Sequence, residues 1–292
     1  KSYFRYLKIA RKNSITRKRM YITGGVGSTV HGEAFTEDYD LPGDTAYAET
    51  CASIALMMCE NGLGFNTIFV TASSIGLIGF ISASLIKAPQ RNILSQRCFS
   101  AKNLLLAVAV PEAAIMALLA FGYGIVTVYL SIYAKEEVGI TSGTGYYFTI
   151  LAAGLVASRL LSAVLLRNGR YIKIFSLGIA CVIVSFFIVA FIHNPFAFFS
   201  SAVFMGIGYG LITPTAQTMI VNMAQDTDRG VANATYLTFF DIGVGSGVFI
   251  GGIIVQHLNY SASYAFSLFL AVCAMFYLHL FIKGHFNTRR LR

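Results

Sequence analysis

Long apolar runs, separated by short breaks that carry charge or turn residues, constrain this chain more than any other feature. A hydrocarbon core about 30 Å thick is crossed by about 20 residues of α-helix. Seven runs reach that length, at about 65–86, 105–133, 142–166, 172–192, 195–220, 231–255 and 262–283. Charged residues make up 12% of the chain, against about 25% in soluble domains. The sequence therefore predicts an all-α membrane protein with about seven transmembrane helices.

Lysine and arginine gather at alternate ends of these runs, and cytoplasmic loops are the ones enriched in both residues. Beyond residue 65, the other side of the membrane has only Lys135. One side collects Lys87, Arg91, Arg97, Lys102, Arg167, Arg170, Lys173, Arg229, Lys283, Arg289, Arg290 and Arg292. This asymmetry predicts a bacterial inner-membrane protein whose C-terminus is cytoplasmic. The net charge of +9 comes mostly from basic residues at the span ends, where lipid headgroups lie. We therefore expect membrane lipid and no nucleic acid as a partner.

Away from the span ends, three charged residues fall inside the predicted spans: Asp241, Glu112 and Arg159. A charge at the bilayer centre costs about 2.5–3.5 kcal/mol on insertion scales, so it usually faces a cavity or a partner. In the functional interpretation, Asp241 or Glu112 binds a proton or a polar substrate, Arg159 is the counter-charge, and Tyr123 lines the same cavity. In the structural alternative, Arg159 clamps the cytoplasmic end, Glu112 reaches lipid headgroups and Tyr123 is a packed aromatic.

Two segments carry a family resemblance. ASRLLSAVLLRNGRYIK is similar to the cytoplasmic loop motif of major facilitator transporters: Arg159, Arg167, Gly169 and Arg170 match, and Leu166 stands where Asp is usual. GYGLITPTAQTMIVNMAQDTDRGVANATYLTFFDIGVGSGVFIGG resembles the tenth and eleventh spans of that family. The resemblance implies that residues 61–292 are the C-terminal part of a transporter that moves a small solute, sugar or drug-like, together with protons. Alternating access rocks one repeat against another, so we expect the missing half to be needed.

Residues 1–60 are unlike the spans. The glycines of TGGVGSTVHGE lack the Lys-Ser/Thr pair of a phosphate-binding loop and the spacing of a dinucleotide fingerprint. GEAFTEDYDLPGDTAYAETCAS closely resembles the active-site segment of glycoside hydrolase family 127, the β-L-arabinofuranosidases, which are built on an (α/α)6 barrel. That resemblance implies that Glu33 is the general acid/base and that Glu49 and Cys51 are zinc ligands.

The nucleophile of that family is a further Cys well downstream, where this chain has membrane helices instead. We therefore expect residues 1–60 to be a loop-rich and helical fragment of the barrel, and the chain not to act as an enzyme. No cofactor is expected, zinc belonging only to the parent hydrolases. Three interpretations stay open: a truncated transporter that is inactive alone, a glycosidase with a membrane tail, and a non-functional chimera. Because the chain starts at Lys1 rather than Met, we expect its N-terminus to be that of a fragment.

Overall fold

The computed structural model describes residues 105–140, 143–166, 169–225 and 228–289, together with four isolated helical positions, Val70, Ser73, Ser74 and Leu77. The hydrolase-like segment 1–60, with Glu33, Glu49 and Cys51, lies outside the described residues. So do Arg167 and most of the first expected span, 65–86.

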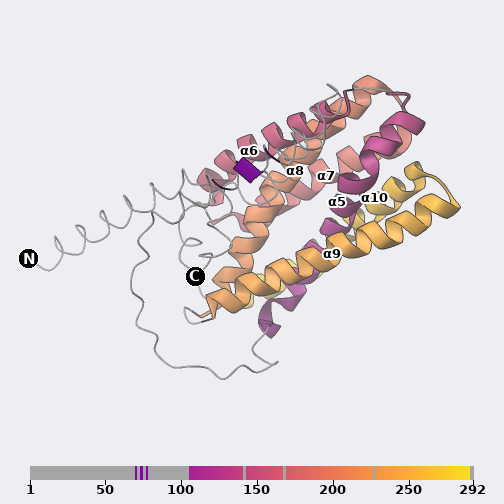
Figure 1. Ribbon diagram of the computed structural model, residues 1–292. Helices are drawn as coiled ribbons and strands as arrows, with labels where there is room; N and C mark the ends of the chain where they lie inside the picture. The colour runs from indigo at the N-terminus through magenta and orange to yellow at the C-terminus, as the bar shows by residue number, and fades with distance from the viewer. Residues whose placement is uncertain are drawn as a thin grey trace, which may run out of the picture.

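Six long helices make up the described bundle (Figure 1). They are α5 (Val110–Glu136), α6 (Gly145–Leu166), α7 (Tyr171–Phe191), α8 (Pro195–Asn222), α9 (Arg229–His257) and α10 (Tyr260–Tyr277). A 3-10 turn, η3 (Ala107–Ala109), precedes α5, and α10 continues through a π-helical turn, η4 (Leu278–Ile282), into α11 (Lys283–Arg289). Across the described ranges there is no strand, and the six long helical stretches are apolar enough to cross a membrane. The predicted all-α membrane fold is confirmed, with six spans described where the sequence suggested about seven.

Local sequence explains where several helices begin. Asn194 precedes α8 and its side chain accepts a hydrogen bond from the Phe196 N–H at 3.0 Å, with Pro195 as the first helical residue. Asn259 caps α10 in the same way, accepting from the Ala262 N–H at 2.7 Å. Both are typical N-cap arrangements, because asparagine satisfies a backbone donor that the helix itself cannot. Gly169, with a φ of 67°, makes the turn between α6 and α7.

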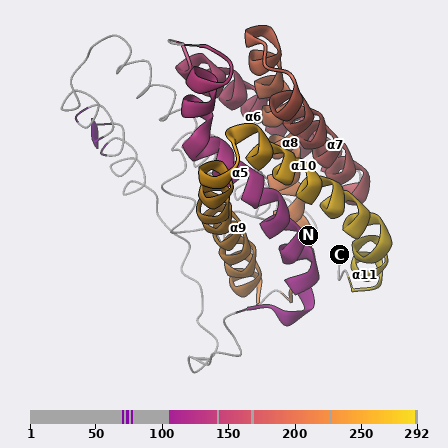
Figure 2. The same ribbon diagram turned by 90° about the vertical axis from the view of Figure 1, so that its right-hand side faces the viewer.

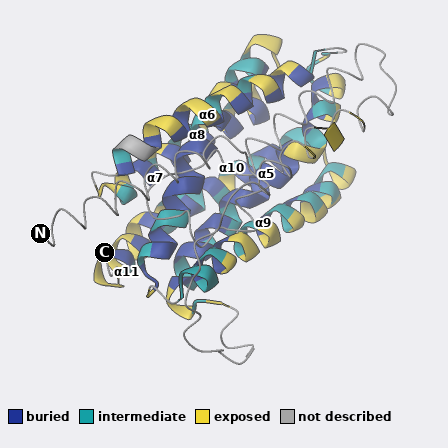
Figure 3. Cartoon of the chain, turned by 60° about the vertical axis from the view of Figure 1, so that its left-hand side comes forward, coloured by how far each residue is buried: buried dark blue, intermediate teal, exposed yellow. Residues whose placement is uncertain are grey.

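Helix α8 lies at the centre of one group of helices, with α6 and α7 packed along it, while α9 packs along α5. Helix α10 contacts both α7 and α5, so it joins the two groups on one side of the bundle (Figure 2). Buried residues line the interior, and exposed residues follow the outer edges of α6 and α9 (Figure 3).

Glycines set the close approach within each group. A Cβ at Gly154 of α6 would lie 3.2 Å from the Gly206 Cα of α8. On α9, a Cβ at Gly243 or Gly247 would collide with the carbonyl oxygens of Ala117 and Phe121 on α5. Backbones that touch in this way are typical of small-residue helix packing in membranes.

Glu137, just after α5, ties the C-terminal end of that helix to α10. Its Oε1 accepts hydrogen bonds from the N–H groups of Tyr260 at 2.9 Å and Ser261 at 3.3 Å, and the Ser261 hydroxyl donates to its Oε2. His193, between α7 and α8, contacts the same serine hydroxyl at 2.7 Å. A carboxylate at a helix N-terminus is favoured by the helix dipole, so this cluster fixes where α10 starts.

Candidate functional site in the membrane bundle

Two tyrosines meet in the middle of the bundle. Tyr123 lies halfway along α5 and Tyr209 halfway along α8, and their ring centroids are 5.0 Å apart. The Tyr209 hydroxyl donates a 2.6 Å hydrogen bond to the Leu119 carbonyl of α5. From α9, the ring of Phe240 lies 5.9 Å from that of Tyr123. Aromatic rings from three helices therefore converge at mid-span.

Arg159 of α6 reaches the same place through Thr213 of α8. Its Nη2 donates to the Thr213 Oγ1 at 3.1 Å, and the threonine hydroxyl donates to the Tyr209 carbonyl at 3.0 Å. The arginine is only 5% exposed, and its guanidinium stays charged in proteins. We call Tyr123, Arg159, Tyr209, Thr213 and Phe240 the central layer.

Asp241 follows Phe240 in the chain but lies on an exposed face of α9. It is 12 residues beyond Arg229, the first residue of that helix, or about 18 Å along the helix axis. The opposite face of α9 carries the buried glycines Gly243 and Gly247, which pack on α5. The structure thus places Asp241 at mid-span, next in sequence to the central-layer residue Phe240. Its side chain lies on the surface of the described bundle.

A second polar contact joins α8 and α9 one helical turn beyond Thr213. The side-chain nitrogen of Gln217 donates to the Asn233 Oδ1 at 2.7 Å. Both side chains are partly buried, and a paired amide inside an apolar bundle satisfies groups that are costly to leave unpaired there. This contact extends the polar path from the central layer toward the ends of α8 and α9.

Glu112 lies apart from the central layer. It belongs to the first turn of α5, 11 residues before Tyr123, which is about 16 Å along the helix. Its side chain is 2% exposed, and its Oε1 lies 2.8 Å from the Nδ1 of His285 on α11. The pair connects the start of α5 with the last helix of the described chain.

The structure therefore links Arg159 to Tyr123 through Thr213 and Tyr209. Asp241 lies on an exposed face of α9, and Glu112 lies at the far end of α5 from Lys135. Of the loop-motif residues, Gly169 makes the turn before α7, and Arg170 is the residue that precedes that helix. Sequence reasoning missed Tyr209, Thr213, Gln217 and His285. The first three are polar residues inside an apolar run, the same signal that singled out Asp241, but hydroxyl and amide groups are common enough in membrane helices to attract less notice.

Comparison with known proteins separates the chain into the two parts that its sequence indicated. Residues 113–290 match the family model of the Major Facilitator Superfamily. Residues 5–67 match the model of the beta-L-arabinofuranosidase GH127 catalytic domain. A curated relative, the non-reducing end beta-L-arabinofuranosidase of Bifidobacterium longum subsp. longum, is 66% identical over 47 residues, which are 16% of this chain.

The chain spans only 7% of the length of that relative, whereas the transporter match runs through all six described spans. Over residues 113–290, the bundle of apolar helices and the family match both indicate a membrane transporter. The chain belongs to the Major Facilitator Superfamily and is a transporter-type membrane protein that carries, at its N-terminus, a short segment similar to a GH127 hydrolase.

Proposed function

We propose that this chain is the C-terminal part of a secondary transporter that moves a small solute, sugar or drug-like, by alternating access and requires a second half to do so. The observation that carries the proposal is the central layer, a buried arginine and converging aromatic rings at mid-span, with Asp241 on the adjacent outward face. Transporters of this kind bind solute near the bilayer midplane, between two repeats.

Asp241 supports the need for a second half. A carboxylate facing hydrocarbon at this depth would cost about 2.5–3.5 kcal/mol. A water-filled path or a polar partner on that face of α9 removes the cost, and the second half of a transporter supplies both. In this position Asp241 carries the coupling proton, and Arg159 provides the opposite charge or holds α6 against α8.

The test is transport by the chain joined to the N-terminal half of a major facilitator, in proteoliposomes, with radiolabelled L-arabinose and ethidium as the two probes. Asp241→Asn is expected to abolish uptake driven by a pH gradient and to retain exchange between labelled and unlabelled solute, because only the proton site is lost. Asp228→Asn, at the start of α9, is the matched control and should retain both activities. Full gradient-driven uptake by Asp241→Asn would rule out the coupling role.

The basic residues at the ends of the helices bear on the orientation of the chain. We propose that the chain lies in the bacterial inner membrane with its C-terminus in the cytoplasm, because the described basic residues Arg170, Lys173, Lys283 and Arg289 lie at the end of the bundle where α7 begins and α11 ends. Lys135 lies at the opposite end, and positive charge favours the cytoplasmic side.

A glycosidase function is the second candidate, and the 66% identity to an arabinofuranosidase favours it. Glu33, Glu49 and Cys51 would supply an acid/base and two zinc ligands. Catalytic zinc sites use three protein ligands, so these two donors alone do not fit the metal. In the described part of the chain, no group of three or more His, Cys, Asp or Glu side chains could hold a metal.

We therefore expect the purified full chain to release no nitrophenol from 4-nitrophenyl β-L-arabinofuranoside, with or without added zinc. Absorbance measured against a buffer blank checks this. Glu33→Gln is the control variant: hydrolysis by the natural chain that this substitution abolishes would establish the enzyme function that we argue against.

A further inference from the structure

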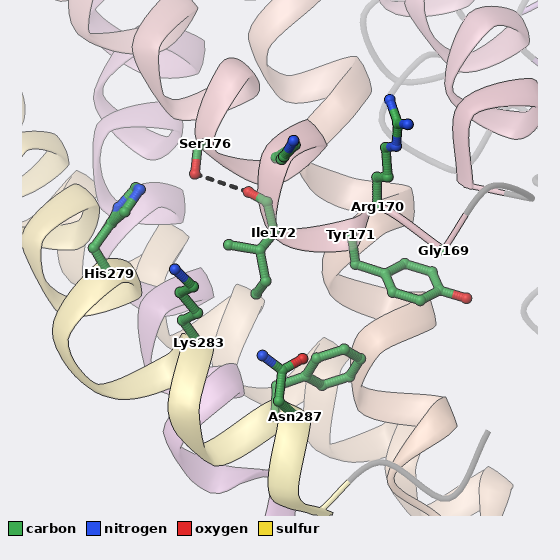
Figure 4. Close-up of a pocket in the computed structure, with 10 residues that line it drawn as sticks. Gly169, Arg170, Tyr171, Ile172, Ser176, His279, Lys283 and Asn287 are labelled. Atoms are coloured by element: carbon green, nitrogen blue, oxygen red, sulfur yellow. Dashed lines mark hydrogen bonds between the residues drawn. The ribbon is translucent and has the colours of Figure 1, made fainter.

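A pocket of about 500 Å³ opens where α7 begins and α10 ends. Its walls come from two segments far apart in the chain, the first turns of α7 with the loop before it, and the η4–α11 stretch. Figure 4 shows Lys283 and His279 extending from that stretch toward Ile172 and Ser176 of α7, with the Asn287 amide beside Lys283. The pocket is therefore built by the meeting of two spans at their ends.

The charged residues that line the pocket are all basic. Lys173, Lys283 and Arg170 line it together with His279, and none of its ten lining residues is acidic. Both lysines are exposed, so their ammonium groups are available to a ligand. Arg170 extends away from Lys283 in Figure 4 and adds charge at the rim rather than a direct contact. A concave surface lined by cations of two helices favours an anion with several acceptor oxygens.

The π-helical turn adds to this arrangement. His279 lies within η4, and Lys283 follows it as the first residue of α11. Turns of this type are rare and occur often at functional sites, because they change which residues share a helix face. The His279 Nδ1 lies 3.1 Å from the Met275 carbonyl, which can only accept, and this contact orients the imidazole ring beside the pocket.

The apolar surface beside the pocket distinguishes a lipid from a soluble anion. One turn further into the membrane, Leu177 on α7 is 54% exposed and Phe276 on α10 is 64% exposed. Leu280, next to His279, is 72% exposed. The candidate spans Tyr171–Phe191 and Tyr260–Arg289 begin and end at the pocket, so its cations lie at the depth of the lipid headgroups and these apolar side chains at the depth of the acyl chains.

We propose that this pocket binds the phosphate headgroup of an anionic phospholipid. Lys173 and Lys283 contact the phosphate oxygens, the Asn287 amide donates to them, and the acyl chains lie against Leu177, Phe276 and Leu280. Basic pockets between transmembrane helices at a membrane surface recognise such headgroups. The proposal goes beyond transport and requires no solute, so it stands or falls independently of the role of Asp241.

The experiment uses the full chain with Phe281→Trp as a reporter, since Phe281 is 63% exposed next to Leu280 and the natural chain contains no tryptophan. In bilayers that mix plain and brominated lipid, brominated phosphatidylglycerol is expected to quench this tryptophan at about tenfold lower mole fraction than brominated phosphatidylcholine. Adding K173Q and K283Q together should remove the preference, since each lysine near the surface is worth about fivefold in lipid affinity. K135Q, at the other end of α5, is the matched control and should keep it.

Three results would overturn the proposal: equal quenching by the two lipids, an equal loss in K135Q, or removal of the preference by inorganic phosphate at constant ionic strength. The last result would assign the pocket to a soluble phosphate instead of a lipid. Circular dichroism and size exclusion check folding. If the double variant fails to fold, K283Q alone, with K283R as the variant that keeps the charge, must show the fivefold loss and its rescue.

Discussion

At the scale of single residues, the Glu112–His285 pair shows how a charge is accommodated in an apolar bundle. The carboxylate is 2% exposed and its partner lies 173 positions later in the chain, 2.8 Å away. A hydrogen bond that involves a charged group contributes about 1.5–3 kcal/mol to stability. The pair therefore fastens α11 to the start of α5.

A double-mutant cycle tests this role. Glu112→Gln and His285→Ala should each lower the melting temperature of the purified chain in detergent, and the double variant should be about as stable as the worse single variant. The expected coupling is about 1–2 kcal/mol. Additive losses would mean that the two side chains act independently.

Single residues also mark the limit of the sequence as a guide. Asp241, Arg159 and Glu112 are recognisable because a charge within an apolar run is unusual. The partners of Arg159 and Glu112 are not recognisable, because Thr213 and His285 become partners only through the way the helices are rotated against one another. A membrane helix that is apolar on every side carries little periodic signal for that rotation.

At the scale of helices, the contact between α5 and α9 depends on backbone approach at particular glycines. Gly247 has no room for a Cβ, which would strike the Phe121 carbonyl oxygen, whereas Gly245, two residues earlier, faces open space. The two positions share a helix and a residue type, and only one lies at an interface. They form a matched pair for testing whether close approach holds the helices together.

Gly247→Ala is expected to destabilise the chain by about 1–3 kcal/mol, because the added methyl group forces the two helices apart. Gly245→Ala should be neutral or stabilising by up to about 1 kcal/mol, because alanine is the better helix former. Thermal unfolding in detergent measures both variants. Stabilisation by both substitutions would show that the glycines act through helix propensity rather than packing.

The presence and approximate position of the helices were the easiest features to predict from the sequence. The apolar runs at 142–166, 172–192 and 195–220 lie over α6, α7 and α8, because about 20 apolar residues between charged breaks leave few other structures in a membrane. The end of α5 was less predictable. The chain stays helical to Glu136, beyond the run that ends at 133, because helical hydrogen bonds continue past the last apolar residue into polar surroundings.

At the scale of the whole molecule, the orientation of the bundle is open to a direct test. A green fluorescent protein fused after Arg292 should fluoresce in intact bacterial cells, because this protein becomes fluorescent only in the cytoplasm. Alkaline phosphatase fused at the same place should be inactive, because that enzyme is active only in the periplasm. The opposite pair of results would place the basic end of the bundle outside and reverse the positive-inside assignment.

The packing of the helices implies where the bundle can change shape. Backbone contacts join α6 and α7 to α8, and others join α9 to α5, so each set can move only as a rigid body. Helix α10 touches both sets along one side, and at the centre the sets meet through the hydrogen bond from Tyr209 to Leu119 and the ring contact with Tyr123. A shear motion along this boundary would keep the glycine contacts within each set, between α6, α7 and α8 and between α5 and α9, while it opened or closed the space around the two tyrosines. Spin labels on α6 and α9 would record that motion as a change in distance, and labels on α6 and α8 would record none.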